Sequence, residues 1–199
     1  MDSKSFRTAL SAATSFLDTP VVTVSVGPDG VNKKDFIVHE GLLKDRSAFF
    51  NNALKTNGFK EGFERIVLMP GDSPKVFALY MQYLYRPDLF FADTKQDGEF
   101  FEQECIALAE LYVFVEKILD QSTKDILLEA FKISSWARLL PVAAAQIICK
   151  GTSERDPARA LFVQSFFRYG QRHSLEAIRN TGHPDFFRDL ALALSLSKR

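Results

Sequence analysis

The chain has 199 residues, a length that suits one domain, or one domain with a helical extension, and 46% of them are hydrophobic, so it can bury a sizeable core. Its 25 Lys and Arg residues balance its 25 Asp and Glu residues. Because this balance gives no long-range attraction for polyanions, the sequence argues against nucleic acid or an anionic membrane as a partner. No apolar run approaches the roughly 20 residues that a membrane span needs.

The N-terminus and the cysteines favour an intracellular protein, in the cytoplasm or the nucleus. Residues 1–18 lack the basic start and the continuous apolar stretch of a signal peptide. Cys105 and Cys149 lie far apart in segments with helical spacing. We therefore expect two reduced cysteines with a structural role.

In chain order, the first predicted element is a short amphipathic helix over residues 4–17. Its apolar positions recur at helical spacing: Phe6, Leu10, Ala13 and Leu17. In residues 21–26, Val22, Val24 and Val26 point to one side of the chain, and Val21, Thr23 and Ser25 point to the opposite side. This alternation predicts a half-buried strand. Residues 27–30 have the composition of a turn, and residues 35–39 can return as the second strand of a hairpin.

The stretch from Phe36 to Phe50 changes from the spacing of a strand to that of a helix at His39. Ser47 is placed to cap a short helix over residues 48–55. We expect residues 59–63 to be a loop and residues 64–69 to be a third strand, in which Ile66 and Leu68 face away from Val67 and Met69.

The rest of the chain is predicted to be helical. Asp72 or Ser73 should cap the first of these helices, with Pro74 in its first turn. The later helices are expected over residues 100–119, 122–139, 142–149, 157–170 and 184–196, with Leu119, Trp136 and Phe167 among the inward positions. Three early strands followed by helices, without β-α-β alternation, predict an α+β fold: a small three-stranded sheet with a hairpin, packed on a cluster of helices and mostly helical overall.

No motif of catalysis or of cofactor binding is present. The sequence has no nucleophile elbow, zinc-protease motif, phosphate-binding loop or dinucleotide fingerprint. His39 is interpreted as a structural residue at the strand–helix junction, and His173 and His183 have no partners at metal-ligand spacing. We therefore expect no enzyme, no cofactor, no metal and no small-molecule substrate. Phe59 and Phe63, in the predicted loop, can either cover the core or form an exposed binding patch.

Several motifs, in order, resemble the BTB/POZ family over residues 20–139. The family has a strand that ends in apolar-x-His, followed by leucine positions and Ser-x-Phe-Phe. The matching residues are His39, Leu43, Ser47, Phe49 and Phe50. The segments 152–154 and 183–187 resemble the helical extension of fungal BTB proteins. The resemblance implies three parts: an N-terminal helix over 1–19, a BTB/POZ domain over 20–139 and a helical extension over 140–199.

The resemblance also implies protein–protein association. Many members are adaptors for cullin-type ubiquitin ligases, and these carry an apolar-x-Glu motif before the third strand. Phe59, Lys60 and Glu61 occupy that place. An exposed aromatic ring can fill a pocket of the partner, and a carboxylate can accept a charge-assisted hydrogen bond. The alternative is that Phe59 packs under the loop while Glu61 is only solvated.

The second hypothesis is a homo-oligomeric scaffold or regulatory protein that does not bind cullin. In dimerising members of the family, an Asp in the first strand and a basic residue in the second form a charged pocket at the dimer interface. Val21 and Ile37 hold these positions here, so both charges are absent. A homodimer would instead use the N-terminal helix and the first two strands. The residues assigned to that interface are Phe6, Leu10, Leu17, Val21 and Ile37.

Overall fold

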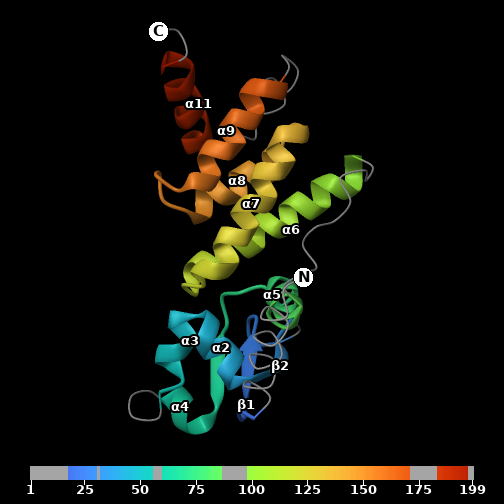
Figure 1. The fold of residues 1–199 in the computed structure, drawn as a ribbon. Coiled ribbons are helices and arrows are strands. Elements are labelled where there is room, and N and C mark those ends of the chain that lie inside the picture. The colour runs from blue at the N-terminus through green and yellow to red at the C-terminus, as the bar shows by residue number, and fades with distance from the viewer. Residues whose placement is uncertain (1–17, 31, 56–59, 87–97, 171–182, 197–199) are drawn as a thin grey trace, which may run out of the picture. The chain divides into compact units, whose positions relative to one another are not determined.

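The computed structural model describes residues 18–30, 32–55, 60–86, 98–170 and 183–196. These residues are mostly helical and contain a small mixed sheet of three strands, which confirms the predicted α+β class (Figure 1). Contacts divide the chain into two compact units. The first comprises Met1–Pro87 with Ile118–Gln121, and the second comprises Asp88–Lys117 with Ser122–Arg199. The domain ranges given by the resemblance stay a prediction, since these units record packing and not family membership.

The sheet of the first unit has β1 at its centre, so β1 has neighbours on both sides. β1 (Val21–Val26) pairs antiparallel with β2 (Lys34–His39) and parallel with β3 (Ile66–Met69). The predicted alternation is confirmed, because Val22, Val24 and Val26 are all buried. In the turn after β1, Gly27 has a φ of 100°, a conformation that favours glycine. The helices of this unit are α2 (Glu40–Arg46), α3 (Ala48–Ala53), α4 (Lys60–Glu64) and α5 (Pro74–Tyr85).

A short segment far along the chain, Ile118–Gln121, completes the first unit at the start of α3. Ser47 caps α3 as predicted, since its Oγ accepts a hydrogen bond from the backbone N–H of Phe50 at 3.2 Å. The same hydroxyl donates to the carbonyl oxygen of Ile118 at 2.5 Å. Tyr80 in α5 donates to the Asp120 carboxylate at 3.0 Å. The buried hydroxyl groups of Ser47 and Tyr80 therefore each have a hydrogen-bond partner in the Ile118–Gln121 segment.

The second unit is a cluster of helices with an aromatic core. Rings follow one another in edge-on contacts, with centroids 5.9 Å apart for Tyr112 and Phe131 and 5.3 Å apart for Phe131 and Phe162. Gly151 lies against Val113, and a Cβ atom added to this glycine would come within 2.3 Å of the valine side chain. The helices are α6 (Gly98–Lys117), α7 (Gln121–Ala137), α8 (Val142–Gly151), α9 (Pro157–Tyr169) and α11 (Pro184–Leu196).

Four local predictions were wrong. Phe167 was expected to face inward from α9 but is exposed. The expected loop before β3 contains the short helix α4, in which Gly62 is buried. The helix predicted to reach residue 119 ends at Lys117, and Leu119 is exposed with a positive φ of 58°. Trp136 was expected to face inward but is exposed, with the Arg168 guanidinium 4.2 Å above its ring.

Among the described residues, no helix is long and apolar enough to cross a membrane.

Replacing Ser47 by alanine should lower the free energy of unfolding by about 1–3 kcal/mol, because the change removes a helix cap and the shorter of the two hydrogen bonds to the carbonyl of Ile118. Ser73 is the matched control: it holds the N-cap position of α5, but its side chain makes no capping bond. Ser73→Ala should change stability by less than about 0.5 kcal/mol. Urea denaturation followed by circular dichroism measures both, and equal effects would contradict the role assigned to Ser47.

Candidate interaction surfaces

The residues of the predicted family motif lie together inside the first unit. Leu43, Ser47 and Phe50 are buried. His39 is half-buried at the end of β2, where its Nδ1 lies 2.8 Å from the hydroxyl oxygen of Tyr85. The backbone N–H of His39 donates to the same oxygen at 3.2 Å. This arrangement agrees with the interpretation of His39 as a residue that orients the strand–helix junction.

The predicted cullin-binding residues fall on α4 and just before it. Phe59 lies outside the described residues, as does the side chain of Lys60. Glu61 is half-buried in the first turn of α4. Phe63, on the same short helix, is 73% exposed. Of the two roles considered for Phe63, core cover or exposed patch, the structure shows the exposed one.

Arg65 fixes α4 to the sheet. Its backbone takes a positive φ of 56°, and its carbonyl accepts a hydrogen bond from Thr23 of β1 at 2.9 Å. Its guanidinium forms an ion pair with Glu40, a carboxylate that is itself nearly buried and also lies 3.2 Å from Lys44. A charge-assisted contact of this kind fixes the path of the backbone between α4 and β3. Phe63 is therefore presented from an ordered support.

A second apolar surface lies on the side of the sheet opposite to the buried valines; we call it the outer sheet face. Its exposed members are Val21 at 51%, Ile37 at 70%, Ile66 at 40% and Leu68 at 61% exposure. Val21 and Ile37 were predicted as interface residues, whereas Ile66 and Leu68 were not. The alternation along β3 indicated that these two share a face, but not that this face would stay open.

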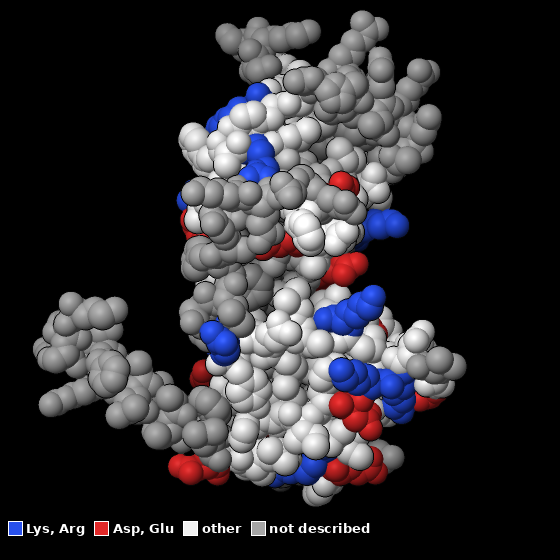
Figure 2. All heavy atoms as spheres, turned by 90° about the vertical axis from the view of Figure 1, so that its right-hand side faces the viewer, with Lys and Arg blue, Asp and Glu red and all other residues white. Residues whose placement is uncertain are grey.

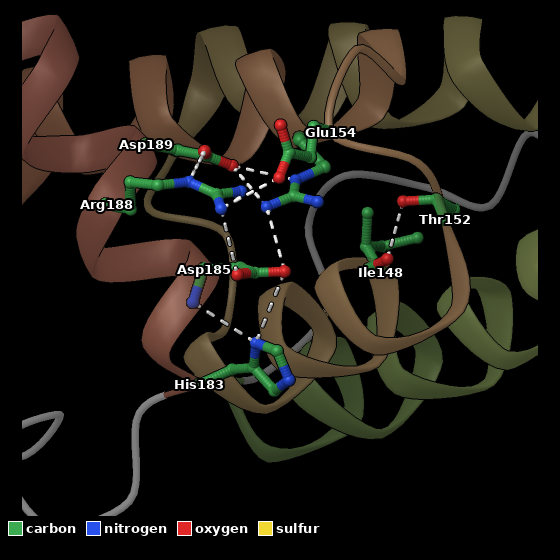
Figure 3. A network of polar contacts seen from close by, with 8 residues as sticks. Ile148, Thr152, Glu154, His183, Asp185, Arg188 and Asp189 are labelled. Atoms are coloured by element: carbon green, nitrogen blue, oxygen red, sulfur yellow. Dashed lines mark hydrogen bonds and ion pairs between the residues drawn. The ribbon is translucent and has the colours of Figure 1, made fainter.

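The second unit contains a polar network around a buried arginine (Figure 3). Arg159 is buried, and its Nε donates to the Asp189 carboxylate at 2.7 Å. Its Nη2 lies 2.7 Å from the same oxygen, where it is not aligned to donate a hydrogen bond, so this contact is purely electrostatic. Arg188 lies 2.8 Å from Glu154. The Asp185 backbone N–H donates to His183 Nδ1 at 3.3 Å.

This network brings together the two short segments that resembled the fungal extension, residues 152–154 and 183–187. A depression of about 340 Å³ lies beside it, lined in part by Glu154, Arg159 and Asp189. The side chains of Arg159 and Asp189 are already paired with each other, so the network mainly stabilises the structure.

Other buried ionisable groups of the second unit are also paired or neutral. Tyr112 donates to Asp156 at 2.8 Å, and Lys124 lies 2.8 Å from the same carboxylate. Burial, with the bond to Asp156, raises the pKa of Tyr112 well above its usual range, so the phenol stays a proton donor. Burial likewise raises the pKa of Cys105 to about 12 and that of Cys149 to about 11. Both thiols are therefore protonated and unreactive near neutral pH.

On the face drawn in Figure 2, Lys and Arg lie beside Asp and Glu, and no field of one sign dominates. Within the described part of the chain, no group of His, Cys, Asp and Glu residues could hold a metal ion. The surfaces that stand out there are apolar: Phe63 on α4 and the outer sheet face.

Replacing Arg159 by alanine should destabilise the second unit by about 3–5 kcal/mol, because it leaves the Asp189 carboxylate without its buried partner. Arg155 offers a matched control, since this arginine is exposed on the connector before α9. Its replacement by alanine should change stability by less than about 0.5 kcal/mol. Thermal unfolding of the two variants would decide, and a stable Arg159→Ala protein would refute the structural role of the network.

No family model matches this chain, and no curated protein matches it.

Proposed function

We propose that this protein is a BTB/POZ-like protein-interaction module without enzymatic activity, which acts as an adaptor between a partner protein and a cullin-type ubiquitin ligase. The observation that carries the proposal is the position of α4. This helix directly precedes β3, as the apolar-x-Glu motif does in adaptor members of the family, and it carries both Glu61 and the exposed Phe63. Phe59, the apolar residue of the motif, comes immediately before this helix.

The chemistry of this surface suits a protein partner. A few buried aromatic side chains commonly dominate the binding energy of an interface, and a carboxylate at their edge adds direction through charge-assisted hydrogen bonds. Because Arg65 already holds the chain next to β1 and Glu40, little further ordering is needed when a partner binds. An ordered support lets more of the contact energy appear as affinity.

The pairing of buried ionisable groups supports the non-enzymatic part of the proposal. A general acid or base must reach the proton that it transfers. Tyr80 instead bonds Asp120, and Tyr112 and Lys124 bond Asp156. These groups are engaged in holding elements of the fold together.

A homo-oligomeric scaffold is the second candidate, and the outer sheet face favours it. Val21 and Ile37 replace the charged pair of dimerising family members, and both side chains are exposed there. Two apolar residues on adjacent strands can be buried by a second copy without leaving a charge unpaired. Phe6, Leu10 and Leu17, assigned to the same interface, lie outside the described residues.

The adaptor proposal predicts that the purified protein is captured by an immobilised cullin N-terminal domain. Replacing Phe59 by alanine and Glu61 by arginine should abolish capture, and Phe63→Ala alone should weaken it by roughly thirtyfold, the effect of losing an anchor worth about 2 kcal/mol. Phe100→Ala with Glu102→Arg is the matched control, because it changes the same apolar-x-Glu spacing at exposed positions of α6. This control should bind like the wild type. Failure of the wild type to bind would sink the adaptor proposal.

The scaffold candidate predicts a dimer or larger assembly at high micromolar concentration. Ile37→Arg should convert it to a monomer, because a charge would then have to be buried against a second copy. Ile133→Arg, at an exposed position on α7, should leave the mass unchanged. Multi-angle light scattering measures all three proteins, and a monomeric wild type would rule out self-assembly as the function.

A further inference from the structure

We propose that the C-terminal ends of α7 and α9 form a binding surface for an acidic peptide segment of a partner protein. The surface consists of Trp136 from α7 and of Phe167, Arg168 and Tyr169 from α9, and we call it the Trp136 surface. Trp136 is 65% exposed, although tryptophan side chains are highly buried on average. Tryptophan, tyrosine and arginine are the residue types that most often dominate the binding energy of protein interfaces.

Arg168 is held in place over Trp136. Its guanidinium carbon lies 4.2 Å from the centroid of the Trp136 ring and 6.0 Å from that of the Tyr169 ring. Its Nη1 donates to the carbonyl of Ser135 at 3.3 Å, and the Tyr169 hydroxyl donates to the carbonyl of Trp136. Both carbonyls belong to the last turn of α7, which the helix cannot satisfy internally. The cation is therefore positioned before a partner arrives, and little side-chain freedom is lost on binding.

The positive charge of Arg168 has no carboxylate partner among the described residues. Arg159, on the same helix, lies 2.7 Å from Asp189, whereas no ion pair between described side chains includes Arg168. Within the same part of the chain, the Ser135 carbonyl is the one acceptor of its guanidinium. The remaining N–H groups of this planar fork can hold a carboxylate by two parallel hydrogen bonds. A carboxylate is therefore the group that complements the site.

A depression of about 500 Å³ adjoins Arg168. Its described lining residues are Gln164, Phe167 and Arg168 of α9 and Ala193 of α11, and Arg168 is the only charged one among these four. Phe167 is 40% exposed. An apolar side chain next to the carboxylate can pack here or on the open ring of Trp136, and the Gln164 amide can bond the backbone of the same peptide.

One cation with apolar neighbours selects a peptide over other anionic partners. A nucleic acid strand is bound through several cations along its backbone. The nearest basic residues of α7 and its C-terminal end are engaged: Lys132 pairs with Glu129 at 3.0 Å, and the Arg138 guanidinium lies 4.3 Å from the centroid of the Phe101 ring. A small free anion would form only an exposed ion pair, which contributes little affinity. An acidic residue beside an apolar one matches both parts of the surface.

This inference does not rest on the adaptor proposal, which concerns α4 in the first unit. If the protein is an adaptor, the acidic segment identifies the class of partner that it delivers. A protein without affinity for cullin can still bind such a segment, so the two proposals fail separately.

The test uses the full chain and a phage-displayed library of random peptides. Trp136 is the only tryptophan of the sequence, so its fluorescence reports directly on this surface. Peptides selected on the wild-type protein should carry Asp or Glu beside an apolar residue, and titration with the synthetic peptides should shift the emission. Replacing the acidic residue of such a peptide by its amide should weaken binding roughly tenfold, a loss of about 1.4 kcal/mol.

Two variants of the protein locate the binding. Arg168→Lys keeps the positive charge but lacks the planar fork, and it should weaken binding roughly tenfold. Trp136→Ala should weaken binding roughly thirtyfold, measured by calorimetry because the fluorophore is then absent. Arg155→Lys is the matched control, since Arg155 is exposed on the connector before α9, and it should bind like the wild type. Circular dichroism verifies that each variant is folded.

Several results would overturn the proposal. One is a selection that recovers no peptide, or only peptides without an acidic residue. Another is equal binding to the wild type and to Arg168→Lys. Emission from Trp136 that changes with protein concentration alone would assign the surface to a second copy of the chain. A shift caused by a single strand of oligothymidine would assign it to nucleic acid instead.

Discussion

The hydrogen bonds between the start of α3 and the Ile118–Gln121 segment complete the first unit. Ser47 donates to a carbonyl 71 positions further along the chain, and Ala48 and Phe49 donate to Leu119 and Ile118 at 3.4 and 3.3 Å. These contacts satisfy N–H groups that no helix can satisfy internally at its first turn. Leu119 takes a left-handed conformation here, at a cost of about 1–2 kcal/mol that the hydrogen bonds offset. A fragment ending before residue 118 would lack this closure.

The exposed apolar residues of the first unit lie outside its core. Its core is supplied by the inward side of the sheet and by α5, where Phe77 packs against Phe36 with ring centroids 4.8 Å apart. The outer sheet face and Phe63 contribute little to that core. Apolar residues that break the usual alternation, without a packing need of their own, are the ones to associate with binding.

Local patterns in the sequence were sufficient to predict much of this fold. The strands, the hairpin turn and the cap at Ser47 depend on side chains near one another in sequence, and the structure has them. The end of α6, the exposure of Trp136 and the helix α4 depend on distant contacts, such as Arg168 over Trp136 and Thr23 bonded to Arg65. β3 is apolar on both faces, so its pattern could not show which face would be covered. Ile66 and Leu68 therefore emerged only from the register.

The arrangement of exposed apolar residues differs between the two units. In the second unit they lie on several helices, with Phe100 on α6, Ile133 and Trp136 on α7, and Leu192 and Leu194 on α11. Trp136 is partly shielded by Arg168, which also donates to the carbonyl of Ser135 at 3.3 Å. In the first unit, four such residues share one sheet face. The first unit therefore exposes apolar side chains on one face of its sheet, whereas the second holds its helices together through buried ion pairs.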